Sequence, residues 1–205
     1  MLLVIAAVVG IVVQSQRSSS GRSNLVVSPS AKGPGGSMLL GSPTAPVLVE
    51  EYGDFQCPHC GEFEKTTYPT IVQLVNQGKI RFAFHFFTFI GPESFALANT
   101  SICAADQGKF WPVHDYFYAN QQPENSGYWT TARLIDVLKQ FGVDNPTSEQ
   151  CVRNHTYYPW LRQLADQASQ RGVTATPTIF VNGTQLDDTS PAGLTAAVNS
   201  QTKSG

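Results

Sequence analysis

The chain has 205 residues, of which 41% are hydrophobic and 11% aromatic, enough apolar material for a real core in one or two domains. Its formal net charge is -2 and it has no run of basic residues, which argues against a nucleic-acid-binding protein. The four cysteines, an even number, are compatible with an oxidising compartment.

An almost uninterrupted apolar run occupies residues 2–13. A helix of this length spans roughly 18 Å, which is less than the ~30 Å hydrocarbon core of a bilayer. No basic residues precede the run, and no small-residue cleavage site follows it. We expect residues 1–13 to be a membrane anchor or a signal segment. Either would place the rest of the chain outside the cytoplasm.

Residues 14–45 are rich in serine, glycine and proline, as in the stretch Lys32 to Ser37. Such a composition cannot bury a core and predicts a flexible linker. The globular domain is expected to extend over residues 46–202.

The first predicted strand covers residues 46–52, where apolar side chains fall on both faces, as in a central strand. A helix is expected to begin near Pro58 and to kink at Tyr68-Pro69, because proline cannot continue the backbone hydrogen bonding. The aromatic run at residues 79–89 predicts a second strand, parallel to the first.

Helical spacing of apolar residues and helix-ending glycines predict four further helices, at residues 93–106, 110–120, 130–141 and about 145–171. A strand is expected at residues 178–181. Asn182-Gly183 is a strong two-residue hairpin signal, with a return strand at 185–188. Residues 191–202 are expected to form the closing helix.

The sequence Cys57-Pro58-His59-Cys60 lies where the first strand gives way to the first helix. Cys57 is then the N-cap residue and Pro58 the first helical residue, a position that suits proline. Unsatisfied backbone N–H groups and the helix dipole both favour an anion at the N-cap. The Cys57 thiol is therefore expected to ionise easily, and Cys60, one turn further, can form a disulfide with it.

Two other interpretations of this pair remain open. A C-x-x-C sequence can be half of a zinc site, but zinc needs about two more ligands and the remaining cysteines are single and far apart. An inert structural disulfide is the other interpretation. The strand–turn–helix context favours a redox pair.

Two stretches resemble the DsbA-like thiol–disulfide oxidoreductases of the thioredoxin superfamily. Residues 54–60 (DFQCPHC) resemble the active-site entry of that family, and residues 176–183 (TPTIFVNG) resemble its cis-proline loop and the following strand. The resemblance covers roughly residues 46–197. It implies an α/β thioredoxin fold with an inserted helical domain at about residues 92–171.

The resemblance also assigns roles to residues. Cys57 is the expected nucleophile and Cys60 the resolving cysteine. His59 is expected to stabilise the Cys57 thiolate, and Glu51 to act as the buried acid that shuttles the Cys60 proton. Thr176, with Pro177 in the cis form, is expected to pair with an extended client. The alternative for Glu51 is a salt-bridged strand residue, and the alternative for Thr176-Pro177 is an ordinary turn with a trans peptide bond.

Further assignments concern the other cysteines, the neighbouring acids and the histidines. The resemblance implies a structural disulfide between Cys103 and Cys151, with two buried free thiols as the alternative. The acids around the pair (Glu50, Asp54, Glu62, Glu64) are expected to be solvated and to oppose the thiolate weakly. His85, His114 and His155 have no mutual spacing for a metal, and the aromatic residues near 111–118, including Tyr118, are expected to be mostly core residues.

Taken with the resemblance, these features predict an extracytoplasmic protein disulfide oxidoreductase, held at the cell membrane by its N-terminus. Its expected partners are unfolded exported proteins and a quinone-linked membrane oxidase of the DsbB or vitamin K epoxide reductase type. No metal, organic cofactor or nucleic acid is expected. A disulfide isomerase or reductase is one alternative, and a non-catalytic chaperone or metal-centre assembly module is another.

Overall fold

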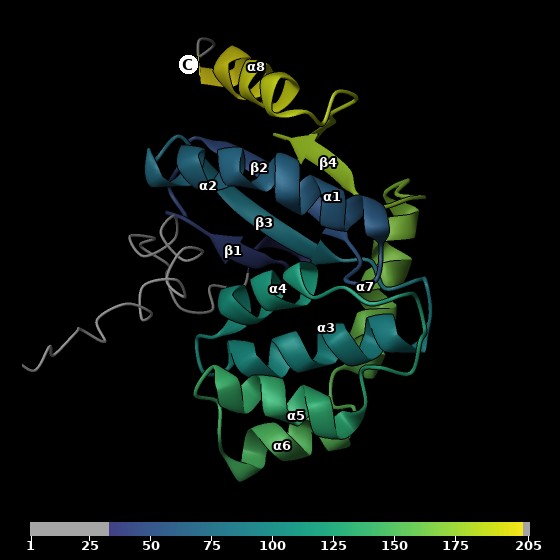
Figure 1. Ribbon diagram of the computed structural model, residues 1–205. Coiled ribbons are helices and arrows are strands. Elements are labelled where there is room, and N and C mark those ends of the chain that lie inside the picture. Colours follow the sequence, from purple (N-terminus) through teal and green to yellow (C-terminus); the bar gives the residue numbers. More distant parts are fainter. Residues whose placement is uncertain (1–32, 203–205) are drawn as a thin grey trace, which may run out of the picture.

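A computed structural model describes residues 33–202 of the chain (Figure 1). The predicted anchor at residues 1–13 and most of the predicted linker lie outside these residues. A five-stranded sheet with strand order β1-β3-β2-β4-β5 forms the centre of the domain. Within residues 33–202, no helix is both long enough and apolar enough to span a bilayer.

The sheet is built around β2 (Val47–Gly53) and β3 (Ile80–Phe86), which lie parallel with Val47 opposite Ile80 and Gly53 opposite Phe86. Two helices, α1 (Pro58–Thr66) and α2 (Tyr68–Asn76), connect the strands across one face of the sheet (Figure 1). The predicted parallel strand–helix–strand unit is therefore present. The helix breaks at Thr67, directly before the turn that contains Pro69, as the proline predicts.

The prediction of a linker is wrong for residues 38–40. Met38–Leu40 form β1, which pairs antiparallel with β3 and is buried, with Met38 opposite Phe84. The glycine- and proline-rich residues before it suggested a linker throughout, but three apolar residues suffice to cover an open sheet edge. The domain therefore includes residues that precede Pro46.

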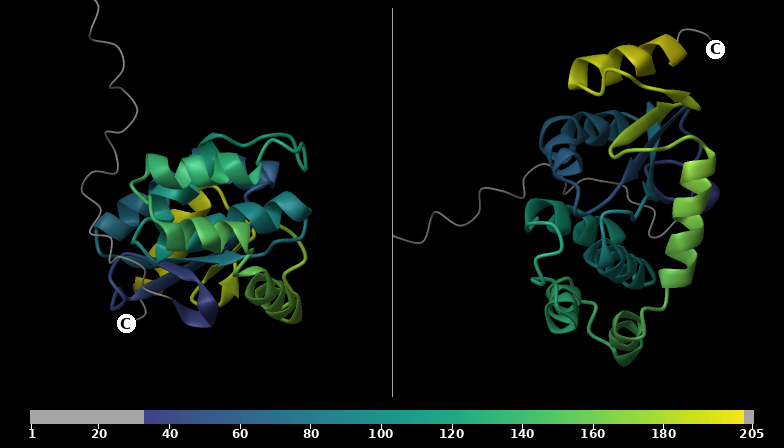
Figure 2. Two further views of the ribbon diagram at one scale, coloured as in Figure 1. Left: turned by 90° about the horizontal axis from the view of Figure 1, so that it is seen from below. Right: turned by 90° about the vertical axis from the view of Figure 1, so that its right-hand side faces the viewer.

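The helical insertion runs from Pro92 to Gln170. It consists of α3 (Pro92–Ala105), α4 (Phe110–Ala119), α5 (Thr131–Gln140), α6 (Pro146–Arg153) and α7 (Tyr158–Gln170). In Figure 1, α4 lies next to the sheet, α3 lies beyond α4, and α5 and α6 lie furthest from the sheet. Figures 1 and 2 show α7 returning along the side to the sheet.

The single helix predicted at about residues 145–171 is in fact two helices. His155, with φ of 52°, lies in the break between α6 and α7, and Pro159 falls in the first turn of α7. Proline suits the first turn of a helix, where no N–H is needed. The helical spacing of apolar residues continues across the break, which is why the sequence did not indicate it.

The C-terminal part completes the sheet. β4 (Thr178–Val181) pairs antiparallel with β2, and β5 (Thr184–Gln185) pairs with β4. Asn182 and Gly183 both have positive φ, as the two-residue hairpin turn requires. The closing helix α8 (Pro191–Thr202) packs against α2 and β2. The return strand is shorter, and begins earlier, than the predicted residues 185–188.

Alternating side chains of β2 point to opposite faces of the sheet. Val47, Val49 and Glu51 face α1, α2 and α4, and the main core lies there. The other face is covered by α7, where Tyr52 stacks on His85 with ring centroids 4.5 Å apart. A buried polar residue, Glu51, thus lies within the apolar core beneath α1.

Arg171, directly after α7, joins the insertion to the sheet. Its guanidinium donates to both Glu50 carboxylate oxygens at 2.8 and 2.9 Å and to the Tyr52 hydroxyl at 2.8 Å. His85 also hydrogen-bonds Glu50, at 3.1 Å. The hydrogen bonds from Arg171 and His85 outweigh the effect of burial and lower the pKa of Glu50 to about 2.

We expect Arg171→Met to lower the free energy of unfolding at pH 7 by about 2 kcal/mol. This loss lies between the losses typical of exposed and of fully buried ion pairs, because the Arg171 side chain is 34% exposed. The unfolded protein binds a proton at Glu50 below pH 4.5, so this contribution diminishes as the pH falls from 4.5 towards 2. Urea unfolding of both proteins at pH 7 and pH 3 measures the difference. An equal difference at the two pH values would contradict the assignment.

Candidate active site

The pair Cys57 and Cys60 lies at the start of α1, directly after β2 and a short turn. Cys57 is the N-cap residue, with an extended backbone (φ −67°, ψ 118°), and Pro58 begins the helix. The Asp54 carbonyl accepts from the Cys57 N–H at 3.0 Å and closes the turn. This is the strand–turn–helix arrangement that the sequence predicts.

The environment of Cys57 favours its thiolate. A hydrogen bond from the Cys60 thiol is the largest contribution; with the Thr176 hydroxyl and the backbone N–H groups of Cys60 and His59, it outweighs burial and lowers the pKa of Cys57 to about 5. The Thr176 carbonyl lies 3.3 Å from Sγ and can accept only from the protonated thiol. The sulfur is therefore mainly an anion at neutral pH.

Cys60 has the opposite character. It is fully buried, and burial, its hydrogen bond to Cys57 and the negative charges of Glu51 and Cys57 all raise its pKa well above the usual value. Neither cysteine is part of a disulfide in this structure. The pair therefore combines one stable thiolate with one stable thiol.

Glu51 lies on β2 with no exposed surface, and neither carboxylate oxygen has a hydrogen-bond partner. Burial, and then the negative charge of Cys57, raise its pKa to about 8. Its carboxyl group is therefore mainly protonated at neutral pH. The alternative of a salt-bridged strand residue does not describe Glu51, whereas it does describe its neighbour Glu50.

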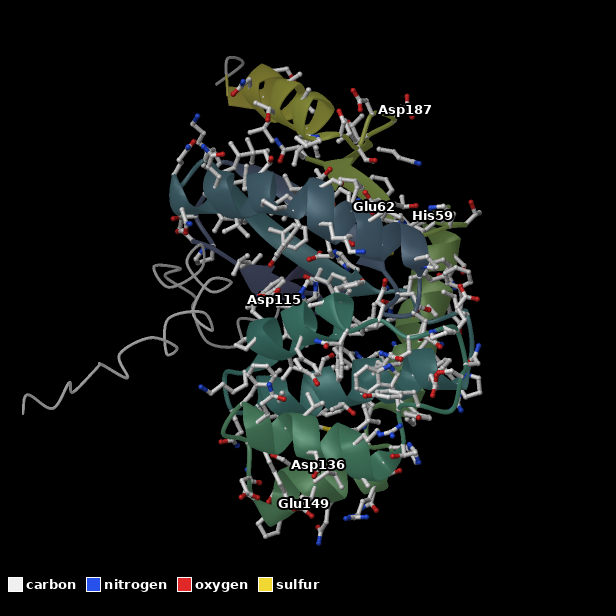
Figure 3. All side chains as sticks on the ribbon, viewed as in Figure 1. His59, Glu62, Asp115, Asp136, Glu149 and Asp187 are labelled. Carbon is white, nitrogen blue, oxygen red and sulfur yellow. A yellow bond between two sulfur atoms is a disulfide. The ribbon has the colours of Figure 1, made fainter. Side chains whose placement is uncertain are left out.

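His59 and Thr176-Pro177 both lie close to Cys57, His59 within the first turn of α1 and Thr176 in contact with the sulfur. His59 is exposed at the start of α1 (Figure 3), and its backbone N–H, rather than its imidazole, is among the groups that favour the thiolate. The Thr176-Pro177 peptide bond is cis, and Thr176 is buried beside the sulfur. The predicted site residues are thus brought together around one sulfur.

The expectation that the neighbouring acids are solvated is wrong for three of them. Glu50, Asp54 and Glu64 are buried, and only Glu62 is exposed. Burial raises the pKa of Asp54, although its carboxylate accepts backbone N–H groups of Gln56, Phe89 and Ile90. Sequence spacing alone did not indicate that these side chains turn inward.

Side chains and backbone of the α4–α5 loop hydrogen-bond the active-site turn, and no sequence motif indicates these contacts. The Gln121 side chain donates to the carbonyls of Phe55 and Cys57 at 3.0 and 2.9 Å. The Gln56 side chain accepts from the Asn125 N–H at 2.7 Å and donates to Ser94. These partners are far apart along the chain, so only the tertiary fold brings them together.

The other two cysteines form a disulfide between α3 and α6. The Cα atoms of Cys103 and Cys151 are 6.0 Å apart, and the residues are separated by 48 positions. The Asn99 side chain donates to the Cys151 carbonyl at 3.3 Å and accepts from the Tyr157 N–H at 2.8 Å, so it binds both ends of the α6–α7 break. The bridge lies within the helical insertion, separate from the Cys57–Cys60 pair.

A thiolate beside a buried thiol and a protonated carboxyl group is suited to exchange of disulfides through a mixed-disulfide intermediate. Thiolate character determines which sulfur is attacked or leaves, and a nearby acid can supply the proton that the buried sulfur needs. Cys103 and Cys151 are bonded to each other, so they cannot complete a zinc site with the pair.

Comparisons with known proteins agree with this chemistry. The family model described as Thioredoxin matches residues 34–200. “Disulfide bond formation protein D” of Bacillus subtilis (strain 168) is 30% identical over 173 residues, covering 82% of this chain and 76% of that protein. “Probable disulfide bond formation protein D” of Bacillus anthracis is 30% identical over 149 residues, covering 70% of this chain and 69% of that protein.

Solved structures give the same result. The crystal structure of oxidised BdbD from Bacillus subtilis has a TM-score of 0.74 and 26% identity, covering 80% of this chain and 92% of that one. The reduced disulfide oxidoreductase DsbG from Mycobacterium tuberculosis has a TM-score of 0.72 and 26% identity, covering 83% and 89%. The chain belongs to the thioredoxin family and is a DsbA-like thiol–disulfide oxidoreductase, with Cys57 and Cys60 as its C-x-x-C pair.

Proposed function

We propose that the protein donates the Cys57–Cys60 disulfide to exported proteins that still carry reduced cysteines. A client thiolate attacks the sulfur of Cys57, and the electron pair of the broken bond passes to Cys60. A second client thiolate then attacks the client sulfur of the mixed disulfide and expels the Cys57 thiolate. The client loses two electrons and the enzyme gains them. In the reverse direction, Cys60 resolves the mixed disulfide.

The observation that carries this direction is the low pKa of Cys57. A thiolate that is stable at neutral pH stabilises the reduced enzyme, so the disulfide is more readily given up. Because the pKa of Cys60 is high, its sulfur must take up a proton when the Cys57–Cys60 disulfide breaks. Glu51, whose carboxyl group is mainly protonated at neutral pH, is proposed as the donor of that proton.

The remaining site residues are proposed to bind the client and to assist Cys57. Thr176, beside the cis Pro177, would pair through its backbone with an extended client. Phe89, half exposed and stacked on Phe87, lies on the loop held by Asp54 and offers an apolar contact for unfolded chains. His59, exposed at the start of α1, is proposed to place a partial positive charge near the Cys57 thiolate.

The reduced enzyme must be oxidised again, and we propose a quinone-linked membrane enzyme of the DsbB or vitamin K epoxide reductase type as the oxidant. We also propose that the catalytic domain lies on the extracytoplasmic side of the cell membrane. The names of the relatives as disulfide bond formation proteins support this location, because stable disulfides form in oxidising compartments. The apolar residues 2–13 are proposed to hold it there.

Equilibrating the protein with glutathione buffers at pH 7 tests the direction. A disulfide donor is expected to have a reduction potential more positive than about −200 mV, in the direction of the ≈ −120 mV that characterises a strong oxidant. A value near the ≈ −270 mV of a thioredoxin would contradict the proposal and would favour a reductase. Oxidative refolding of a reduced, unfolded test protein, with and without the enzyme, provides the activity measurement.

A further inference from the structure

The interface of α1 and α4 contains Cys60 and, next to it, three polar side chains that the exchange chemistry above does not use. Cys60 and Glu64 lie four residues apart on α1, and His114 and Tyr118 lie four residues apart on α4, so each pair occupies one helix face. All four are buried, and the two helices pack against each other. Burying such groups is unfavourable without compensation, so their presence in an otherwise aromatic core needs a reason.

Tyr118 lies at the inner end of this interface, next to the active site. A Cβ atom placed on Gly53 would lie 2.9 Å from the Tyr118 hydroxyl, and Gly53 and Glu51 occupy the same face of β2. The Tyr118 hydroxyl is buried without a hydrogen-bond partner, as are both oxygens of Glu51. Burial, and then negative charge on Cys60 or Glu51 when either is ionised, raise the pKa of this hydroxyl. Two unpartnered polar groups thus lie in the core next to Cys60.

His114 lies one turn further along α4 and has a carboxylate at each ring nitrogen. Its Nδ1 hydrogen-bonds Asp115 Oδ1 at 3.1 Å, and its Nε2 makes a longer, ion-pair contact of 3.8 Å with Glu64 Oε1. The imidazole ring is fully buried among aromatic rings and lies 4.8 Å from the Phe84 ring, which is paired with Glu51 across the sheet. The Asp115 side chain is 20% exposed, so this series of polar side chains reaches solvent at Asp115.

These three residues form the one cluster of possible metal ligands found within residues 33–202. One ligand atom from each residue lies within 4.8 Å of the others, but the shortest carboxylate contacts are made to different nitrogens of the ring. Imidazole can accept a proton at one nitrogen and release one at the other, so this arrangement suits proton transfer across the ring. Figure 3 shows Asp115 on α4, below α1, whereas His59 lies at the far end of α1 where clients would dock.

We propose that the buried polar side chains between α1 and α4 form a proton path from Glu51 to the protein surface. From the inside outwards, the path consists of Tyr118, Glu64, His114 and Asp115. We call it the α1–α4 path. It would reach solvent away from the client-binding entrance, so a proton can reach Cys60 while a bound client covers Cys57.

The proposed steps balance with one proton and two electrons. When the disulfide is attacked, Cys60 leaves as a thiolate and takes the proton of the Glu51 carboxyl group. Glu51 is reprotonated through the path, by a proton that enters from water at Asp115. The client thiols lose their own protons to solvent before they attack. Without protonation, the Cys60 thiolate attacks Cys57 again and reverses the step. Delivery of a proton to Cys60 therefore prevents this reversal and lets the exchange proceed.

The test uses the full-length protein and a small dithiol, dithiothreitol, so it depends on exchange at Cys57–Cys60 but not on the proposed direction or client. Asp115→Asn retains a hydrogen-bond acceptor for His114 but cannot relay a proton. Tyr118→Phe removes only the hydroxyl. We expect each variant to slow reduction of the disulfide at pH 7 by about tenfold, measured by acid quenching and thiol labelling. Glu62→Gln, on the exposed face of α1, is the matched control and should be unchanged.

A second measurement separates a path from a merely structural role. A path changes forward and reverse rates equally, so the equilibrium constant with glutathione should stay within about twofold of the wild-type value. Rates within twofold of wild type in both variants would overturn the proposal. So would an equilibrium constant that changes by the same factor as the rate, which would indicate an electrostatic effect on the thiols. If Tyr118→Phe does not fold, Asp115→Asn decides, because its side chain already meets solvent.

Discussion

Replacing Cys57 by serine is expected to abolish disulfide exchange, whereas replacing Cys60 by serine should leave a reactive Cys57 that accumulates mixed disulfides. The structure gives the two sulfurs unequal roles, because Cys57 has a pKa of about 5 and lies at the helix start, and Cys60 is fully buried. Without Cys57, no accessible thiolate remains in the pair. Non-reducing gels of each variant mixed with a reduced client measure both results.

The pH dependence of Cys57 alkylation tests the cause of its acidity. The hydrogen bond from Cys60 is the largest contribution, and a serine hydroxyl can also donate, whereas alanine cannot. The midpoint of alkylation by iodoacetamide should therefore stay near pH 5 in Cys60→Ser. It should rise by about 1 to 2 pH units in Cys60→Ala, because hydrogen bonds to charged groups contribute about 1.5–3 kcal/mol. Equal midpoints in the two variants would show that the helix start alone makes the thiolate.

The same shift has a consequence for stability. The pKa of Cys57 is lowered from 9.0, so the unfolded reduced chain binds more protons between pH 9 and pH 5. The stabilisation of the reduced protein is therefore largest above pH 9 and is lost as the pH falls to about 5. Glu51, with its raised pKa, acts in the opposite direction between pH 4.5 and 8. The oxidised protein has no Cys57 thiolate, and the charge of that thiolate contributes to the raised pKa of Glu51. The difference between reduced and oxidised melting temperatures therefore measures the Cys57 contribution together with this part of the Glu51 shift.

The local features of the site could be predicted from the sequence because they depend on neighbouring residues. A proline directly after Cys57 fixes the start of α1, so Cys57 was correctly placed at the N-cap. Asn182-Gly183 determined the hairpin in the same way. The thioredoxin fold with its helical insertion followed from two motifs in the correct order, at residues 54–60 and 176–183.

The features that the sequence missed depend on contacts between distant residues. Glu64 sits on a helix whose exposed face also carries acids, so only packing against α4 distinguishes it from Glu62. Tyr118 looked like one more core aromatic residue, and its isolated hydroxyl becomes evident only next to Gly53. Gln121 holds the active-site turn from a loop without any motif. Polar side chains that act through tertiary contacts leave no periodic signal in the sequence.

Removing the bridge between Cys103 and Cys151 is expected to lower the free energy of unfolding by roughly 4 kcal/mol, because the bond closes a loop with a sequence separation of 48 residues. This corresponds to a decrease of about 10 °C in the melting temperature. The double variant Cys103→Ala, Cys151→Ala should show this in urea unfolding, with Cys57 and Cys60 kept oxidised in both proteins.

The matched control for the bridge is Asn99→Ala, which removes hydrogen bonds to the α6–α7 break but leaves the sulfurs joined. It should cost less than the loss of the bridge, about 1–3 kcal/mol, as expected for an unsatisfied buried group. Cys57 alkylation at 25 °C should keep its midpoint in both variants, since the bridge joins α3 to α6 within the insertion. A shifted alkylation midpoint would mean that changes in the helical insertion alter the environment of Cys57. A loss of less than about 1 kcal/mol in the free energy of unfolding of the double cysteine variant would mean that helix packing alone holds α6 in place.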